Sequence, residues 1–188
     1  MSTLSQENIL QYLRPHRREQ FQTWDSERRN LLIDRLQACI PFLKHFPVAA
    51  DALPSHLLRI DSGILLHFGW IIDKNELCEL AIKSFPEAVH RDNNLAPIPG
   101  VTTFFVIGPI AEACKLPGLS IQRCRIGPHE SDVNHLVLSL ASNSNFERRM
   151  EELSKEGIDK LKEMVRLQGP PRWFVHHDVY IWLSFDPV

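Results

Sequence analysis

The sequence lacks the short motifs by which many catalytic and cofactor sites are recognised. It contains no C-x-x-C pair, no H-E-x-x-H, no G-x-S-x-G and neither of the glycine-rich loops that cradle phosphates. These absences argue against zinc ribbons, thioredoxin-like redox centres, common hydrolase types and nucleotide binding by a known loop. No repeat of about 20 to 50 residues and no low-complexity tract is present either.

Long apolar runs and a strong net charge are also missing. No stretch approaches the roughly 18 uninterrupted apolar residues of a membrane span. The formal charge at pH 7 is only −2, so no global field attracts phosphate backbones or anionic lipids. The arginines between residues 14 and 29 are interleaved with acidic residues at helical pairing distances, which is typical of a solvated face. We therefore expect neither a nucleic-acid partner nor a membrane partner.

An export signal is not visible at the N-terminus, where no basic segment precedes an apolar one. We accordingly expect a cytoplasmic, intracellular and soluble protein. Its four cysteines would permit two disulfides by number, but a reducing compartment favours free thiols. They are Cys39, Cys78, Cys114 and Cys124.

The composition that is present suits an ordinary globular core. With 188 residues, of which 44% are hydrophobic, the chain can form one domain over residues 1–188 without disulfide or metal staples. The order of elements predicts an α+β fold: a small, mostly antiparallel sheet with helices packed on one side. An N-terminal helical segment, residues 1–43, precedes a mixed α/β core over residues 57–188.

Apolar periodicity and capping patterns place the elements of this fold. In the N-terminal part, they predict a short helix ending near Pro15 and a longer amphipathic helix from there to about Pro41. Further on, they predict a helix over residues 74–84 and a charged helix capped by Ser144 and Glu147, which Gly157 breaks in two.

Three segments are assigned to strands. Residues 57–73 contain two short strands joined by a turn, or a buried helix. Residues 119–127 and 134–142 form two strands that pair as an antiparallel hairpin. Residues 101–115 are either a strand to Ile107 followed by a helix or one kinked helix.

The densest group of polar and aromatic side chains is PPRWFVHHDVYIWLSF, residues 170–185. If Trp173–Leu183 is one strand, its alternation places His177 on the core face. His176 and Asp178 then share the opposite face, where a substrate or metal would meet both.

Two functions of different classes fit this stretch, and whether the protein is an enzyme stays open. The first is a non-enzymatic protein that binds a protein partner or a small ligand through the aromatic C-terminal strand and neighbouring loops, without a cofactor or metal. Its ligand-binding candidates are Trp173, His176, Asp178, Tyr180 and Trp182. The alternative is a metal-dependent hydrolase using His176 and Asp178, with a third ligand from residues 129–135, where the candidates are His129, Glu130, Asp132 and His135.

Overall fold

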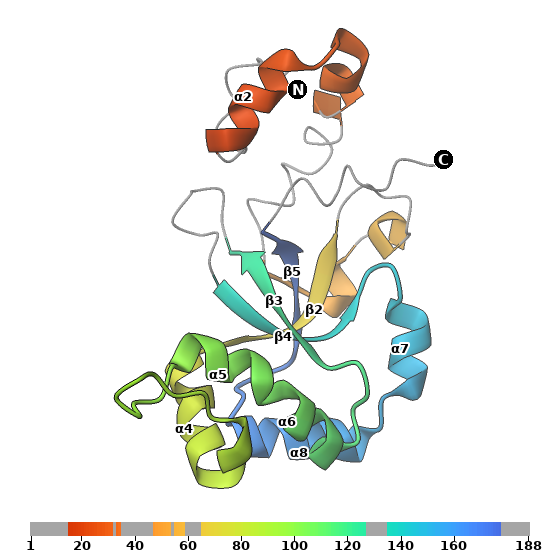
Figure 1. The fold of residues 1–188 in the computed structure, drawn as a ribbon. Coiled ribbons are helices and arrows are strands. Elements are labelled where there is room, and N and C mark those ends of the chain that lie inside the picture. The colour runs from red at the N-terminus through yellow and green to blue at the C-terminus, as the bar shows by residue number, and fades with distance from the viewer. Residues whose placement is uncertain are drawn as a thin grey trace.

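The computed structural model describes residues 15–31, 33–34, 47–53, 55–58, 65–126 and 135–177 (Figure 1). Its helices are α2 (Pro15–Thr23), α4 (Lys74–Ser84), α5 (Pro99–Phe105), α6 (Ile107–Cys114), α7 (Phe146–Glu152) and α8 (Lys155–Val165), with the 3₁₀ turns η1 (Ala50–Ala52), η2 (Ser55–Leu58) and η4 (Pro86–Ala88). Its strands are β1 (Val48–Ala49), β2 (Leu66–Ile72), β3 (Ser120–Arg125), β4 (His135–Ser142) and β5 (Arg172–His176).

The five strands form one antiparallel sheet in the order β1-β5-β2-β4-β3, which confirms the predicted α+β class. The last strand in this order, β3, also pairs with β5, where Cys124 lies opposite His176. The sheet therefore curls, so that the edge strand β3 closes against β5. The predicted β3–β4 hairpin pairing is confirmed, with Ile121 opposite Leu138.

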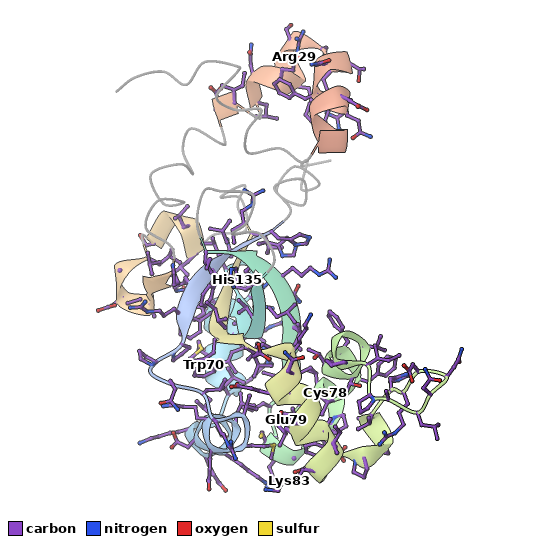
Figure 2. All side chains as sticks on the ribbon, turned by 90° about the vertical axis from the view of Figure 1, so that its left-hand side faces the viewer. Arg29, Trp70, Cys78, Glu79, Lys83 and His135 are labelled. Carbon is purple, nitrogen blue, oxygen red and sulfur yellow. The ribbon has the colours of Figure 1, made fainter. Side chains whose placement is uncertain are left out.

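Helices pack against one face of this sheet, which we call the helix-covered face. Alternate strand residues, including Phe68, Leu138 and Trp173, join apolar side chains of α4, α6 and α8 in one buried cluster. Figure 2 shows α4, marked by Cys78, Glu79 and Lys83, beside the sheet that carries Trp70 and His135. Burial of these alternating apolar residues is the main force that holds helices and sheet together.

The helix predicted over residues 74–84 is confirmed as α4. Asp73 caps it, because its Oδ1 accepts hydrogen bonds from the backbone N–H groups of Asn75 and Glu76. The helix follows β2 directly, so Asp73 and Glu76 are held at the point where strand becomes helix. This short connection later positions one side of the candidate site.

The strand predicted over residues 101–107 is wrong, and the kinked-helix alternative describes this segment better. Pro99 starts α5, and α6 follows it with Val106 in αR conformation between them. Pro109 has no N–H to donate to the carbonyl of Phe105, which explains a break at this point. Local helix signals thus override the β-branched and aromatic composition.

The charged helix after residue 144 does break in two, but not at Gly157. The helix α7 begins after Asn145 without a side-chain cap, so the predicted capping box of Ser144 and Glu147 is not formed. The break falls at Leu153, and Ser154 caps α8 by accepting from the Gly157 N–H. A Cβ at Gly157 would lie 2.5 Å from the carbonyl oxygen of Cys114, so glycine allows α8 to approach α6.

The long N-terminal helix is interrupted. The helix α2 ends at Thr23, and helical backbone resumes at residues 26–31 and 33–34. The reason lies in Asp25, whose Oδ1 accepts from the Arg28 N–H and so starts a new helix. The predicted short helix before Pro15 and the predicted end of the long helix near Pro41 lie outside the described residues.

In the 57–73 segment, the second predicted strand is confirmed as β2, whereas residues 55–58 form the turn η2 and not a strand. Cys78, Cys114 and Cys124 are free and buried, so the prediction of free thiols is confirmed for these three. Cys39 lies outside the described part. None of the helices that the structure describes combines the length and the hydropathy needed to span a membrane.

Candidate functional site

The C-terminal strand β5 places its side chains on two different faces. Trp173 and Val175 belong to the helix-covered cluster, whereas Phe174 packs with Cys124 and Val137 on the opposite face. We call this second face the histidine face, because cross-strand register gives it His67, opposite Phe174, and His135 and His176, both opposite Cys124. The face also carries Gly69, Ile71, Ser139 and Arg172.

The predicted contrast between the two adjacent histidines is wrong. His176 is the buried one, with 5% of its surface exposed, whereas His177 is only half-buried. The strand ends at His176, and the backbone N–H of His177 donates to the carbonyl of Arg123. Alternation beyond the last strand residue therefore does not decide where His177 points.

His176 is hydrogen-bonded to a second buried histidine that the sequence did not single out. Its Nδ1 lies 3.0 Å from Nε2 of His67, and the two rings are 5.1 Å apart. Nδ1 of His67 lies 3.5 Å from Oγ of Ser139. The pKa of His67 is lowered to about 3, mainly by burial and to a smaller extent by repulsion from His176 and then from His177. This histidine is consequently neutral at physiological pH.

The chain of Ser139, His67 and His176 has the residue types of a nucleophilic triad but not its geometry. Oγ of Ser139 donates to the carbonyl of Ala141 at 3.0 Å, so its proton is directed away from His67. Ser139 is also 3% exposed, which leaves a substrate no access to its hydroxyl. We interpret this chain as a buried, hydrogen-bonded polar network with a structural role.

The metal-site alternative can be followed only in part. His135 and His176 lie on the same face, each opposite Cys124, whose thiol pKa is raised by burial. Within the ranges that the structure describes, however, no group of three or more His, Cys, Asp or Glu side chains is arranged to hold a metal ion. Asp178 and His129 lie outside those ranges, so the hydrolase hypothesis stays a prediction.

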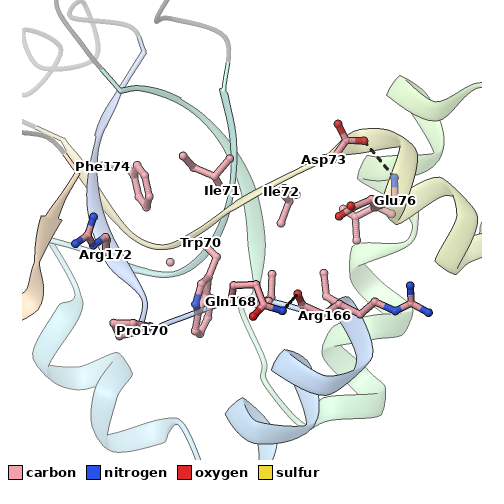
Figure 3. A pocket seen from close by; sticks show the side chains of 14 residues that line it. Trp70, Ile71, Ile72, Asp73, Glu76, Arg166, Gln168, Pro170, Arg172 and Phe174 are labelled. Carbon is pink, nitrogen blue, oxygen red and sulfur yellow. Dashed lines mark hydrogen bonds between the residues drawn. The ribbon is translucent and has the colours of Figure 1, made fainter.

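A cleft of about 510 Å³ lies where β5 begins, and its lining includes strand residues of both faces: Gly69, Ile71, Arg172 and Phe174 from the histidine face and Trp70 and Ile72 from the helix-covered face. Figure 3 shows Arg172 and Phe174, both from β5, on one side of this cleft. Asp73 and Glu76, from the end of β2 and the first turn of α4, lie on the opposite side. Its volume is within the usual range of small-ligand sites, roughly 300 to 1,000 Å³.

The loop between α8 and β5 forms another wall of the cleft, with Gln168 and Pro170. Trp70 holds this wall in place, since its Nε1–H donates to the carbonyl of Gly169 at 3.2 Å. Gly169 has a positive φ of 68°, which glycine adopts without steric cost. The wall is thus fixed by a buried indole and not only by the course of the loop.

Apolar and charged groups are segregated in the cleft. Ile71, which exposes 44% of its surface on β2, and Phe174 on β5 both line the cleft and together provide its apolar centre. The charged lining residues are two acids, Asp73 and Glu76, and two bases, Arg166 and Arg172. Their formal charges cancel, so the cleft favours no net-charged ligand as a whole.

Of the predicted ligand-binding residues that the structure describes, neither Trp173 nor His176 lines the cleft, although their strand neighbours Arg172 and Phe174 do. Trp173 is fully buried in an aromatic cluster with Phe68 and Phe146, away from the cleft. His176 lies two residues beyond Phe174 on the same face, in the histidine pair. Asp178, Tyr180 and Trp182 lie outside the described residues.

Sequence reasoning missed Arg172, Ile71 and Glu76 as site residues. No motif marks them, and only alternation along β2 and β5 together with the pairing of Gly69 and Arg172 brings them to one cleft. A signal did exist for Glu76, which belongs to the capping pattern that begins at Asp73. No model of a known protein family matches this chain, and no curated protein and no solved structure is similar to it.

Proposed function

We propose that the protein is a non-enzymatic binding protein that holds a small ligand in the cleft at the start of β5. The observation that carries this proposal is the cleft itself, which has about 510 Å³ of space between the C-terminal strand, its preceding loop and the start of α4. An apolar centre with a few polar groups around it is the usual composition of a small-ligand site. The C-terminal strand thus acts through Arg172 and Phe174.

Two charged side chains at the rim of the cleft, Arg172 and Glu76, support a binding role because they have no partner in the described part of the protein. Within the part of the chain that the structure describes, the Arg172 and Glu76 side chains form no hydrogen bond or ion pair. Charged groups without a partner in the protein do not have to give up an internal ion pair or hydrogen bond when a ligand arrives. A ligand with a polar group at either end and an apolar middle fits this arrangement best.

Filling the cleft tests the proposal. We expect the variant Ile71→Trp to abolish the binding of small molecules that wild-type protein selects from a diverse library, because the indole would occupy the apolar centre. Ligand-observed NMR measures the loss directly. The matched control is Ile82→Trp, since Ile82 is 45% exposed on α4 and does not line the cleft.

The two variants add the same side chain to equally exposed isoleucines, so they separate occupation of the cleft from added surface hydrophobicity. Equal binding by wild type and Ile71→Trp would contradict the proposal, as would a library screen in which wild type selects nothing. A loss shared by Ile71→Trp and Ile82→Trp would also contradict it.

A further inference from the structure

We infer that the ligand of this cleft is a short peptide with free ends, bound in an extended conformation; this inference rests on the proposed function. It deepens the proposal by assigning each end of the ligand to one side of the cleft. Arg172 would receive the terminal carboxylate, and Glu76 the terminal ammonium group. Ile71 and Phe174 would contact the side chains between them.

The charge balance of the lining selects a zwitterion. Two acids and two bases line the cleft, and they occur on different elements. A phosphate-rich ligand such as a nucleotide would find only partial compensation, because Asp73 and Glu76 would repel it. A ligand that carries one positive and one negative group satisfies both sides at once.

The two acids are not equivalent as partners for a ligand, and neither are the two bases. Oδ1 of Asp73 is already engaged as the cap of α4, so only its Oδ2 is available, whereas both carboxylate oxygens of Glu76 are. Glu76 is therefore the better acceptor for an ammonium group. On the basic side, Figure 3 shows the Arg166 guanidinium beyond Glu76 and pointing away from Phe174. Arg172, on the opposite side, is therefore the cation best placed for a carboxylate, which it can bind through two parallel hydrogen bonds.

The separation of the two sides sets the length of the peptide. Arg172 pairs with Gly69, and Asp73, the cap of the helix whose first turn carries Glu76, follows Gly69 by four positions along the chain. At about 3.3 Å per residue, this part of β2 spans roughly 13 Å. An extended peptide covers at most about 3.3 to 3.6 Å per residue, so three or four residues bridge the cleft. The ammonium and carboxylate groups of a single amino acid are much closer together than this backbone span, so a short peptide matches it better.

The test uses a pool of tripeptides and tetrapeptides with varied central residues, prepared with free ends, with acetylated N-termini or with amidated C-termini. Equilibrium dialysis against the full chain, followed by mass spectrometry, measures which peptides are retained. We expect retention of free peptides, and at least tenfold weaker retention when either end is blocked. The preference should be strongest for peptides with an apolar central residue.

Two substitutions assign the ends. Arg172→Gln should weaken the binding of free peptides and remove the preference for a free carboxylate while keeping that for a free ammonium group, and Glu76→Gln should do the reverse. The control variants are Arg123→Gln on β3 and Glu112→Gln on α6, exposed residues that do not line the cleft. Both controls should keep the full wild-type preference.

The possible failures can be told apart. If blocked peptides are retained as well as free ones, or if Arg172→Gln and Glu76→Gln leave both preferences unchanged, the inference is wrong. The binding function would still stand if Ile71→Trp removed other library ligands. If wild type retains no peptide but binds other small molecules in the cleft, the peptide inference also fails, whereas a protein that binds neither set contradicts both proposals.

Discussion

The two faces of the sheet are buried by different means. On the helix-covered face, residues such as Leu138 and Trp173 meet apolar side chains from α4, α6 and α8. On the histidine face, His67, Ser139 and His176 are almost as buried, but they are polar and hydrogen-bonded to one another or to backbone. Neighbouring residues of the same strand, which point to opposite faces, are therefore stabilised by different kinds of interaction.

This difference has an energetic consequence. Apolar burial is non-directional and tolerates small shifts, because it depends on the area removed from water. A buried polar group instead needs a partner at hydrogen-bond distance, and losing that partner costs about 1 to 3 kcal/mol. The histidine face thus depends on specific polar partners, whereas the stability of the helix-covered face depends on how much apolar area it removes from water.

The largest expected effect separates two adjacent residues of β4. Leu138 and Ser139 are 0% and 3% exposed, on the helix-covered face and the histidine face respectively. We expect Leu138→Ala to lower the free energy of unfolding by about 2 to 5 kcal/mol, because it leaves a cavity in the main core. Ser139→Ala should cost only about 1 kcal/mol for its hydrogen bond to Ala141.

Urea-induced unfolding of the two variants and the wild type measures both values. The two faces would not differ in the proposed way if Ser139→Ala were as destabilising as Leu138→Ala. A change in the slope of unfolding with urea would indicate that a variant alters the denatured state, and would call for a second method.

Elements with strong local signals were predictable from the sequence. The helix α4 has a capping aspartate and regularly spaced apolar residues, and the strands β3 and β4 are short alternating or β-branched segments bounded by turn residues. The errors occurred where a local signal competed with another one. Pro99 and Pro109 decided the α5–α6 segment against β-propensity, and the cap at Asp25 interrupted an otherwise continuous apolar stripe.

The candidate site was much less predictable, since it depends on register. Nothing in the sequence states that His67 pairs with Phe174, or that Gly69 faces Arg172. These pairings bring together residues about 100 positions apart and determine which side chains share a face. The polar stretch after Trp173 was a useful indication of the region, but its residues divided between the core, the histidine pair and the segment outside the described ranges.

A second prediction tests the two neighbouring histidines. We expect His176→Ala to lower the free energy of unfolding by about 1 to 3 kcal/mol, because it removes a buried ring and the partner of Nε2 of His67. His177→Ala should cost less than about 1 kcal/mol, since its Nδ1 contact with the Arg123 carbonyl is exposed to water. Chemical denaturation measures both, and the opposite ranking would restore the assignment made from strand alternation.

Measured per pH unit, the smallest expected effect is a dependence of the free energy of unfolding on pH. The pKa of His67 is lowered in the folded protein from 6.5 to about 3, first by burial and then by His176 and His177. Between these values, the unfolded chain binds more protons than the folded one, so the free energy of unfolding falls as pH falls from about 6.5. One such proton contributes at most about 1.4 kcal/mol per pH unit.

Urea unfolding between pH 7 and pH 4 should show this decline for wild type and for His90→Gln, a control in an exposed loop. His67→Gln cannot take up a proton at this position and should give a shallower curve, whereas an unchanged slope would mean that other groups control the acid sensitivity of the histidine face.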